Sequence, residues 1–203
     1  MKPKGYYSRY NHFLNLDLRN VESFQTIKNW LRRKKKPVDI GCGLGHLTSF
    51  WGAVGIDNDP QAIKIAKKHF PKSKFILGDV TKKLPFKNNS IDALICYNIL
   101  EHLPDKGRKK FFKEAKRVLK KDGIFIAGYI DEDYWFNRLL GSLIPNYGIK
   151  DPTHVVSWKV QDFRKEISKY FKIIKEKRTS PYGKLTFITY YLKGEVIILA
   201  KFF

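Results

Sequence analysis

The amino-acid sequence predicts an α/β fold built around a mostly parallel sheet, with helices on both faces. Three observations support this prediction. Short apolar segments of strand length alternate with helical segments along most of the chain. The apolar segments lack the polar alternation of half-exposed strands, which favours strands buried on both faces. A cluster of glycines joins the first apolar segment to the helix that follows, so a ligand-binding turn is expected there.

Length and composition narrow the possible classes of protein. The chain has 203 residues, of which 43% are hydrophobic, enough for one domain with a two- or three-layer core. No apolar run approaches the roughly 18 residues of a membrane helix, and the first residues lack the apolar core of a secretory signal. Cys42 and Cys96 fit a reducing compartment and lack zinc-site spacing. We therefore expect a cytoplasmic protein with no membrane span and no metal ligands.

The first half of the chain has clear element boundaries. Apolar residues recur at helical spacing from Val21, and the strand after this helix ends at the glycine cluster. Pro60 stands at a first-turn position, which proline favours, and Pro71 follows the same helix. The expected elements are helices at 21–33, 44–51 and 60–69, and strands at 37–40, 53–56 and 74–77.

The second half contains the clearest helix. Phe111, Phe112 and Ala115 belong to its apolar stripe, and lysines and arginines fill the opposite face. Gly123 is expected to cap the turn into the next strand. Residues 131–158 are irregular and aromatic. The expected elements are helices at 105–120 and 160–170, and strands at 91–96, 124–127, near 171–176 and at 195–203.

The strongest local signal is the segment from Val38 to Thr48, V-D-I-G-C-G-L-G-H-L-T. A dinucleotide-binding G-x-G-x-x-G loop would need glycine where this chain has His46 or Thr48, and the Gly-Lys-Ser/Thr of a P-loop is absent. Asp39, just before the loop, would repel a pyrophosphate. Its carboxylate suits a ligand that carries a cationic sulfonium and an ammonium group.

These residues resemble the first motif of class I S-adenosylmethionine-dependent methyltransferases. Further motifs of that family follow in the same order, and the resemblance covers residues 37–130. It implies a Rossmann-like, doubly wound, seven-stranded sheet whose last strand is antiparallel, and the E-H-L-P-D run is typical of the type 11-like subgroup. The segments that carry the further resemblance are 55–60, 77–80, 95–104 and 118–126. Only Leu44–Gly52 separates the glycines from the second strand, so the first helix after them should be shortened.

The resemblance implies S-adenosylmethionine as the cofactor. Asp57 would accept hydrogen bonds from the ribose hydroxyls, and Asp79 would meet the adenine amino group. The alternatives are a strand-end cap for Asp57, a turn residue before Thr81 for Asp79, and a loop-shaping role for Asn58. The expected cofactor-binding residues are Asp39, Gly41, Cys42, Gly43, Gly45, Asp57, Asn58, Asp79, Val80, Tyr97 and Asn98.

Three residues are candidates for acid–base catalysis. Glu101 and His102 follow the fourth strand, where the transferable methyl group should lie, but they could instead cap the next helix or satisfy each other. His154 lies where this family builds its substrate lid, and an imidazole can accept the proton of a hydroxyl nucleophile. It could equally be a surface histidine bonded to Asp151.

The resemblance also sets the expected domain organisation. One methyltransferase domain spans 1–203, with neither repeat nor linker. Its parts are an N-terminal lid and helix (1–36), a cofactor-binding core (37–130), a substrate-lid insertion and helix (131–170) and C-terminal strands (171–203). Aromatic residues could close the lids or line a pocket, or pack in the core: Tyr6, Tyr7, Tyr10, Trp135, Phe136, Tyr147 and Trp158.

The expected function is methyl transfer to a small-molecule or lipid-like acceptor. The net charge of +21 also allows a nucleic-acid partner, although a lysine-rich surface is common in thermophile proteins. An RNA methyltransferase is the first alternative, but the stretch at 97–100 is not the Asn/Asp-Pro-Pro-Tyr/Phe motif of base amine methylation. A non-catalytic cofactor-binding partner and a nicotinamide oxidoreductase are further alternatives. The acceptor atom, the need for a general base and the oligomeric state are not specified by the sequence.

Overall fold

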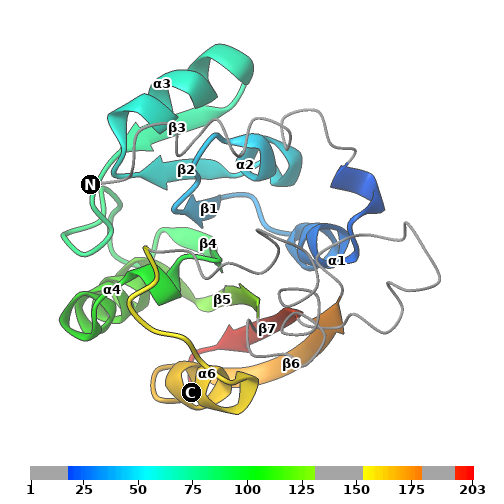
Figure 1. Cartoon of the computed structure of the whole chain (residues 1–203), viewed down its shortest axis with the longest axis vertical. Helices are drawn as coiled ribbons and strands as arrows, with labels where there is room; N and C mark the ends of the chain where they lie inside the picture. The colour runs from blue at the N-terminus through cyan, green and yellow to red at the C-terminus, as the bar shows by residue number, and fades with distance from the viewer. Residues whose placement is uncertain (1–17, 131–152, 180–194) are drawn as a thin grey trace, which may run out of the picture.

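A computed structural model describes residues 18–130, 153–179 and 195–203. Seven strands form a single sheet in the order β3-β2-β1-β4-β5-β7-β6 (Figure 1). The first five pair in parallel, whereas β7 runs antiparallel to both β5 and β6. The predicted fold class is therefore confirmed. The strands are β1 Pro37–Ile40, β2 Val54–Asp57, β3 Lys74–Leu77, β4 Ile91–Tyr97, β5 Leu119–Ile130, β6 Lys172–Thr179 and β7 Glu195–Lys201.

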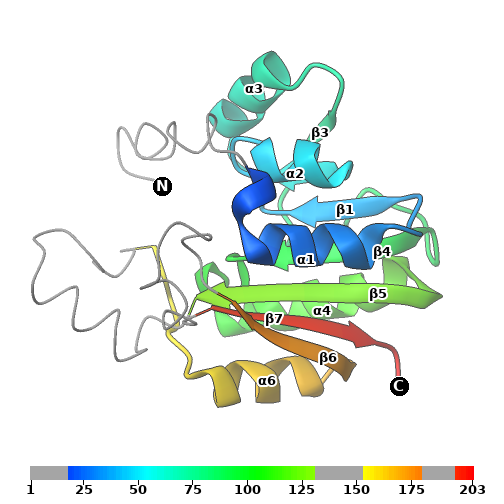
Figure 2. The same ribbon diagram turned by 90° about the vertical axis from the view of Figure 1, so that its right-hand side faces the viewer.

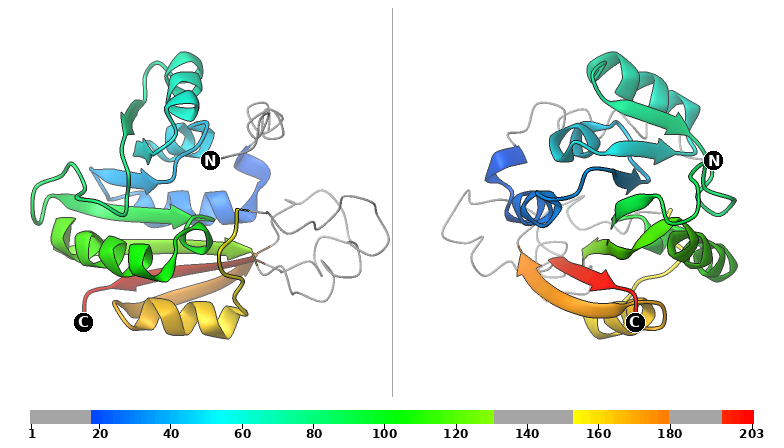
Figure 3. Two further views of the ribbon diagram at one scale, coloured as in Figure 1. Left: turned by 60° about the vertical axis from the view of Figure 1, so that its left-hand side comes forward. Right: turned by 180° about the vertical axis from the view of Figure 1, so that it is seen from behind.

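Helices cover both faces of the sheet. Figure 2 shows α1 and α2 in front of the strands, and the left view of Figure 3 shows α4 and α6 on the opposite side. Phe75 of β3 contacts α3 from the face that also carries Ile95, so α3 lies on the side of α1 and α2. The helices are α1 Glu22–Leu31, α2 His46–Trp51, α3 Pro60–His69, α4 Asp105–Val118 and α6 Val160–Ser168.

The core has a large cluster on each side of the sheet. On one face, Phe111 and Phe112 of α4 and Phe163 of α6 pack against apolar residues of β4, β5 and β7. On the other face, Phe24 and Ile27 of α1 pack against alternate residues of the same strands. All these rings and side chains are buried. Every central strand therefore presents apolar side chains to both layers, which explains its continuous apolar sequence.

One predicted detail differs from the structure. Strand β5 begins at Leu119, directly after α4, instead of at residue 124. Its pairing with β4 jumps from Ile91–Leu119 to Ala93–Ile124, so the residues around Gly123 form an irregularity within the strand and not a turn before it. Of the two alternatives for Trp158, the structure shows the core one, since Trp158 is buried beside Tyr129 and Phe163.

The shortened first helix is confirmed. Helix α2 has six residues and ends at Gly52, which adopts a left-handed conformation with φ +65°. The other aromatic residues of the two expected lids, together with Asp151, lie outside the described residues. Among the described helices, none combines the length and apolar character that a membrane crossing requires.

Strand order fixes the place where a ligand is expected. The chain proceeds outward from β1 to β2 and β3, then returns to the other side of β1 with β4. Open α/β sheets bind ligands outside the carboxyl ends of the strands at such a switch point. Gly41 follows β1 and Asn98 follows β4, so these two residues flank it.

Candidate functional site

The glycine loop after β1 has three left-handed residues, Gly41, Gly43 and Gly45, with φ of +71°, +51° and +83°. A Cβ at Gly41 would lie 2.4 Å from Cδ1 of Ile99, and one at Gly45 would lie 2.6 Å from the ring of Phe75. A Cβ at Gly43 would meet nothing within 4 Å. Two of the glycines are therefore required by packing, whereas the space beside Gly43 is open.

The amide groups of this loop are largely used within the protein. Those of Gly41 and Cys42 both donate to the carbonyl oxygen of Ile56, at 2.8 and 3.0 Å, and that of Gly45 donates to Cys42. A phosphate-binding loop needs such N–H groups turned toward the ligand. Their internal use supports the exclusion of a pyrophosphate. The Cys42 thiol is buried against Gly55, and burial raises its pKa, so Cys42 offers only backbone to a ligand.

Asp57, the last residue of β2, joins its strand to the glycine loop. One carboxylate oxygen accepts the amide of Gly43 at 2.8 Å, and the other accepts the amide of Asp59 at 2.9 Å. The residue is 5% exposed. A carboxylate oxygen can accept more than one hydrogen bond, so these contacts orient Asp57 without using all its lone pairs. The strand-end role and a ligand-binding role are compatible.

Asp39 lies one strand away and is buried at 3% exposure. Its carboxyl accepts a hydrogen bond of 2.5 Å from the hydroxyl of Thr48 in α2. Burial raises the pKa of Asp39 to about 7, the Thr48 bond lowers it, and the nearby charge of Asp57 raises it. Asp39 would therefore act on a ligand through its charge under the loop and through the hydrogen bond that positions Thr48 of α2.

Asp79 and its neighbours follow β3. Its carboxylate accepts the backbone amide of Thr81 at 2.9 Å and the hydroxyl of Thr81 at 2.7 Å, and this hydrogen bonding lowers the pKa of Asp79. These contacts are the ones expected if Asp79 is a turn residue before Thr81. Val80 is buried in the core, and Asn58, after β2, is exposed. The cofactor contacts expected of all three remain predictions.

Tyr97 and Asn98 end β4 in different ways. The Tyr97 ring packs edge-on against Phe24 and Trp51, and its hydroxyl hydrogen-bonds the carboxyl of Glu195. Its side chain thus faces the α1 layer, so only its backbone lies at the strand end. Asn98 has a left-handed φ of +50°, and its amide donates to Gly128. Its Oδ1 is buried without a hydrogen-bond partner among the described residues.

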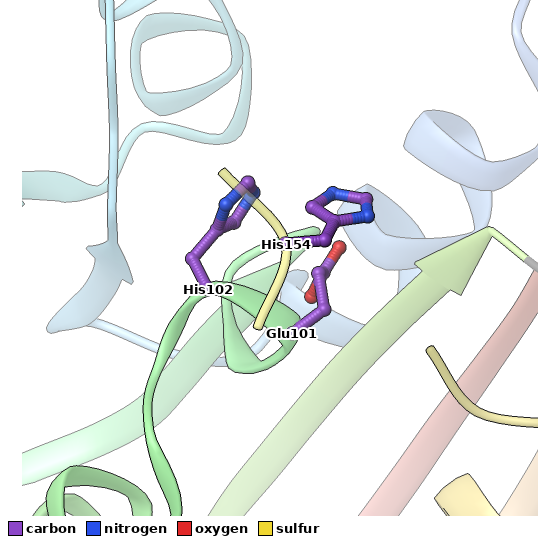
Figure 4. A group of neighbouring side chains, drawn as sticks. All are labelled: Glu101, His102 and His154. Atoms are coloured by element: carbon purple, nitrogen blue, oxygen red, sulfur yellow. The ribbon is translucent and has the colours of Figure 1, made fainter. Parts of the chain in front are cut away.

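Glu101, His102 and His154 come together although 52 residues separate the last two (Figure 4). Glu101 and His102 belong to the short helix η3 Leu100–His102, and the two imidazole rings lie 4.5 Å apart, edge to face. Nδ1 of His102 lies 2.9 Å from the hydroxyl of Thr153. The carbonyl of Glu101 accepts the amides of Val155 and Val156, at 2.9 and 3.3 Å. The segment that carries His154 is thereby tied to η3.

This group of three lies beside the glycine loop, since Ile99, between Asn98 and η3, packs on Gly41. Glu101 is buried, and both histidines are half-buried. The N-cap position of the next helix, α4, is taken by Pro104, so neither Glu101 nor His102 occupies it. His154 contacts His102, so it is not an isolated surface side chain.

Residues 38–127 match the family model described as a methyltransferase domain. The whole described fold also agrees with solved structures of that architecture. Residues 38–127 thus resemble the class I S-adenosylmethionine-dependent methyltransferases in sequence, and the described fold resembles theirs. A methyltransferase from Thermotoga maritima superposes with a TM-score of 0.72 at 20% identity, covering 98% of this chain and 95% of that one. A Pyrococcus horikoshii protein gives a TM-score of 0.75 at 21% identity, covering 98% and 99%.

The curated sequence relatives of this chain are matched over a shorter region. The ubiquinone/menaquinone biosynthesis C-methyltransferase of Campylobacter jejuni is 32% identical over 111 residues, covering 48% of this chain and 46% of the relative. The chain thus spans about half the length of the curated relatives it matches.

The residues at this switch point fit S-adenosylmethionine in three respects. The space beside Gly43 is open, so a ligand can approach its backbone. The buried Oδ1 of Asn98 has no partner among the described residues and can accept a ligand N–H. Two carboxyl groups, Asp39 and Asp57, lie beneath the loop and suit a ligand with positive charge. Asp57 would hold the ribose, and the backbone at Asn98 would lie near the methionine part.

Three residues of the site were not predicted from the sequence. Thr48 holds Asp39, Thr153 contacts His102, and Glu195 holds Tyr97. Thr48 and Thr153 are ordinary loop and helix residues whose partners lie on other elements, so no local pattern marks them. Glu195 is different: an acidic residue directly before the apolar run Val196–Ala200 is a visible signal, because a charged group at a buried strand start needs partners.

Proposed function

We propose that this protein transfers a methyl group from S-adenosylmethionine to a small-molecule or lipid-like acceptor. The observation that carries the proposal is the Asp57 carboxylate at the end of β2, fixed by the amides of Gly43 and Asp59 at the switch point of the sheet. It stands beside a glycine whose Cβ position is open. Hydrogen-bond acceptors at this point support ribose binding, and the amides of Gly41, Cys42 and Gly45, which are bonded within the protein, do not favour a phosphate.

S-adenosylmethionine, when bound, supplies the activated methyl group. The residues of this chain bind and orient the two reactants and exclude water, which accounts for much of the rate enhancement in transfers of this kind. Asp57 and Asn98 hold opposite sides of the switch point, and Asp39 places negative charge between them. Asn58 and Asp79 follow β2 and β3 at the same edge of the sheet, where they would contact the adenine end of the cofactor.

The acceptor side is assigned to η3 and the segment after residue 152. Glu101, His102 and His154 are the candidate catalytic residues, because they combine a carboxylate and two imidazoles beside the glycine loop. The small-molecule class is supported by the Campylobacter jejuni relative, whose name places it in ubiquinone and menaquinone biosynthesis. The net charge of +21 makes RNA the second acceptor class to test.

The decisive experiment is calorimetric titration with S-adenosylhomocysteine, with NAD as the comparison ligand. We expect one site with micromolar affinity for S-adenosylhomocysteine and no measurable binding of NAD. Absence of S-adenosylhomocysteine binding would overturn the proposal. Transfer of label from methyl-labelled S-adenosylmethionine is then screened with phenols, quinols and RNA. Binding without transfer to any of them would favour a non-catalytic partner protein.

A further inference from the structure

We propose that Glu101, His102 and His154 together bind one divalent transition-metal ion. Each residue offers one ligand atom, and the three atoms lie within 4.8 Å of one another. The sequence predicted no metal ligands, because Glu101-His102 and His154 are far apart in the chain and have no recognisable spacing. The fold creates the donor set. Figure 4 shows the histidines approaching from two separate segments, with the Glu101 carboxylate beside His154.

The distances suit a shared ion after a small adjustment. Two ligands of one zinc ion, each about 2.1 Å from it, lie at most about 4.2 Å apart. The largest separation, within 4.8 Å, exceeds that by little more than half an ångström, which rotation of the side chains can close. No backbone movement is required. The carbonyl of Glu101 already holds the amides of Val155 and Val156, so the two segments are joined before any ion binds.

The hydrogen bond to Thr153 points to the ligating nitrogen of His102. Nδ1 of His102 lies 2.9 Å from the Thr153 hydroxyl and 3.3 Å from the Thr153 carbonyl oxygen. An imidazole that donates from Nδ1 carries its lone pair on Nε2, which is then the metal-ligating atom, and such outer partners fix the orientation of most metal-bound histidines. Thr153 is therefore a positioning residue for the site.

The donor set selects the class of ion. Two imidazoles and one carboxylate are the ligands of catalytic zinc sites and of non-haem iron(II) sites, and both leave coordination positions open. Magnesium and calcium prefer all-oxygen sites. We therefore infer a preference for Zn²⁺, Fe²⁺ or Co²⁺ over Mg²⁺, with an open position for an oxygen ligand.

The role of the ion rests on the proposed function, whereas its binding does not. A hydroxyl bound at the open position has a lowered pKa, since the ion stabilises its deprotonated form. The chemical class of acceptor that profits is an alcohol or phenol. Its proton leaves to water, its oxygen attacks the methyl carbon, and the S–CH₃ bond breaks so that S-adenosylhomocysteine leaves. An acceptor carbon gains less from this site.

The test uses the whole chain, freed of metal by a chelator and titrated with Co²⁺, followed by displacement with Zn²⁺. We expect one ion per chain, a visible absorption band from bound Co²⁺, and no competition by millimolar Mg²⁺. His154→Ala should weaken Co²⁺ binding at least 100-fold, and Thr153→Val about 10-fold through loss of the positioning bond. His69→Ala, at an exposed histidine on α3, is the matched control and should change nothing.

The result that would overturn the inference is wild-type protein that binds no Co²⁺, or binds it equally well after His154→Ala with the fold intact by circular dichroism. His102→Gln provides a second variant if His154→Ala fails to fold. S-adenosylhomocysteine affinity is measured on the same samples. Wild-type protein that binds S-adenosylhomocysteine but no Co²⁺ would overturn this inference alone, whereas wild-type protein that binds Co²⁺ but no S-adenosylhomocysteine would overturn the proposed function alone.

Discussion

The two halves of the site are built in different ways. On the side of β1, β2 and β3, the acidic side chains are fixed by groups close in sequence: Asp57 by Asp59 and Gly43, and Asp79 by Thr81. On the side of β4, Glu101 and His102 meet His154 across about 50 residues. The first half is a set of strand-end loops supported from within or by the neighbouring loop. The second half exists only when two distant segments dock, so its geometry depends on the complete fold.

The largest expected effect comes from a substitution in the first half of the site, formed by the loops after β1, β2 and β3. Asp57→Ala should weaken S-adenosylhomocysteine binding at least 100-fold, because it removes the ribose acceptor and the anchor of the Gly43 amide together. Asp59→Ala is the matched control. Its carboxylate caps α3 by accepting the amides of Gln61 and Ala62, so it should cost about 1 kcal/mol of stability while affinity is retained. Equal losses of affinity in both variants, measured by calorimetry, would contradict the assignment.

The next prediction compares two glycines of the loop after β1, one required by packing and one beside open space. Gly45→Ala should lower the melting temperature strongly, because its Cβ would lie 2.6 Å from the Phe75 ring in a left-handed backbone. Gly43→Ala has only the cost of the left-handed backbone, about 1 kcal/mol, since its Cβ meets nothing. Thermal unfolding and calorimetry together check this. Gly43→Ala should keep the fold and lose cofactor affinity, and unchanged affinity would place the ligand elsewhere.

The charge under the loop gives a smaller, pH-dependent effect. Burial raises the pKa of Asp39 to about 7, so this carboxyl becomes fully ionised only above neutral pH. S-adenosylmethionine has a positive sulfonium that S-adenosylhomocysteine lacks. Affinity for the first should therefore rise several-fold from pH 6 to pH 8, and affinity for the second should rise less. In Asp39→Asn the two ligands should show the same pH profile, and a difference that survives this substitution would exclude Asp39 as its source.

This contrast also explains what the sequence could predict. The fold class, the strands flanking the glycine loop and the shortened α2 follow from periodicity and from glycines next to apolar runs, which are local signals. The positions of Asp39, Asp57 and Asp79 at strand ends follow from the same signals. The contact of His102 with His154 and the turn of Tyr97 toward Glu195 do not, because each depends on which distant segment packs there. Gly123 was misplaced for a related reason: the register between β4 and β5 is set by the sheet and not by the glycine.

The smallest expected effect tests the support behind Tyr97. Glu195 is fully buried at the start of β7, where the Tyr97 hydroxyl and the Thr179 hydroxyl both contact its carboxyl, the latter at 2.6 Å. Burial raises its pKa to about 8, a hydrogen bond from Ser23 lowers it, and the charge of Glu22 raises it. The folded protein therefore binds a proton here that the unfolded chain releases above about pH 4.5.

Because the folded state binds more protons in that window, the stability contributed by Glu195 is present at low pH and declines as the pH rises through about 8. Glu195→Gln keeps an uncharged polar side chain at all pH values. We expect the melting temperature of wild type to fall relative to that of Glu195→Gln between pH 5 and pH 9, by a few degrees. Parallel profiles would mean that Glu195 is already ionised in the fold. The Tyr97 hydroxyl would then donate to a charged acceptor. The β4 side of the site would be joined to β7 by a charge-assisted hydrogen bond.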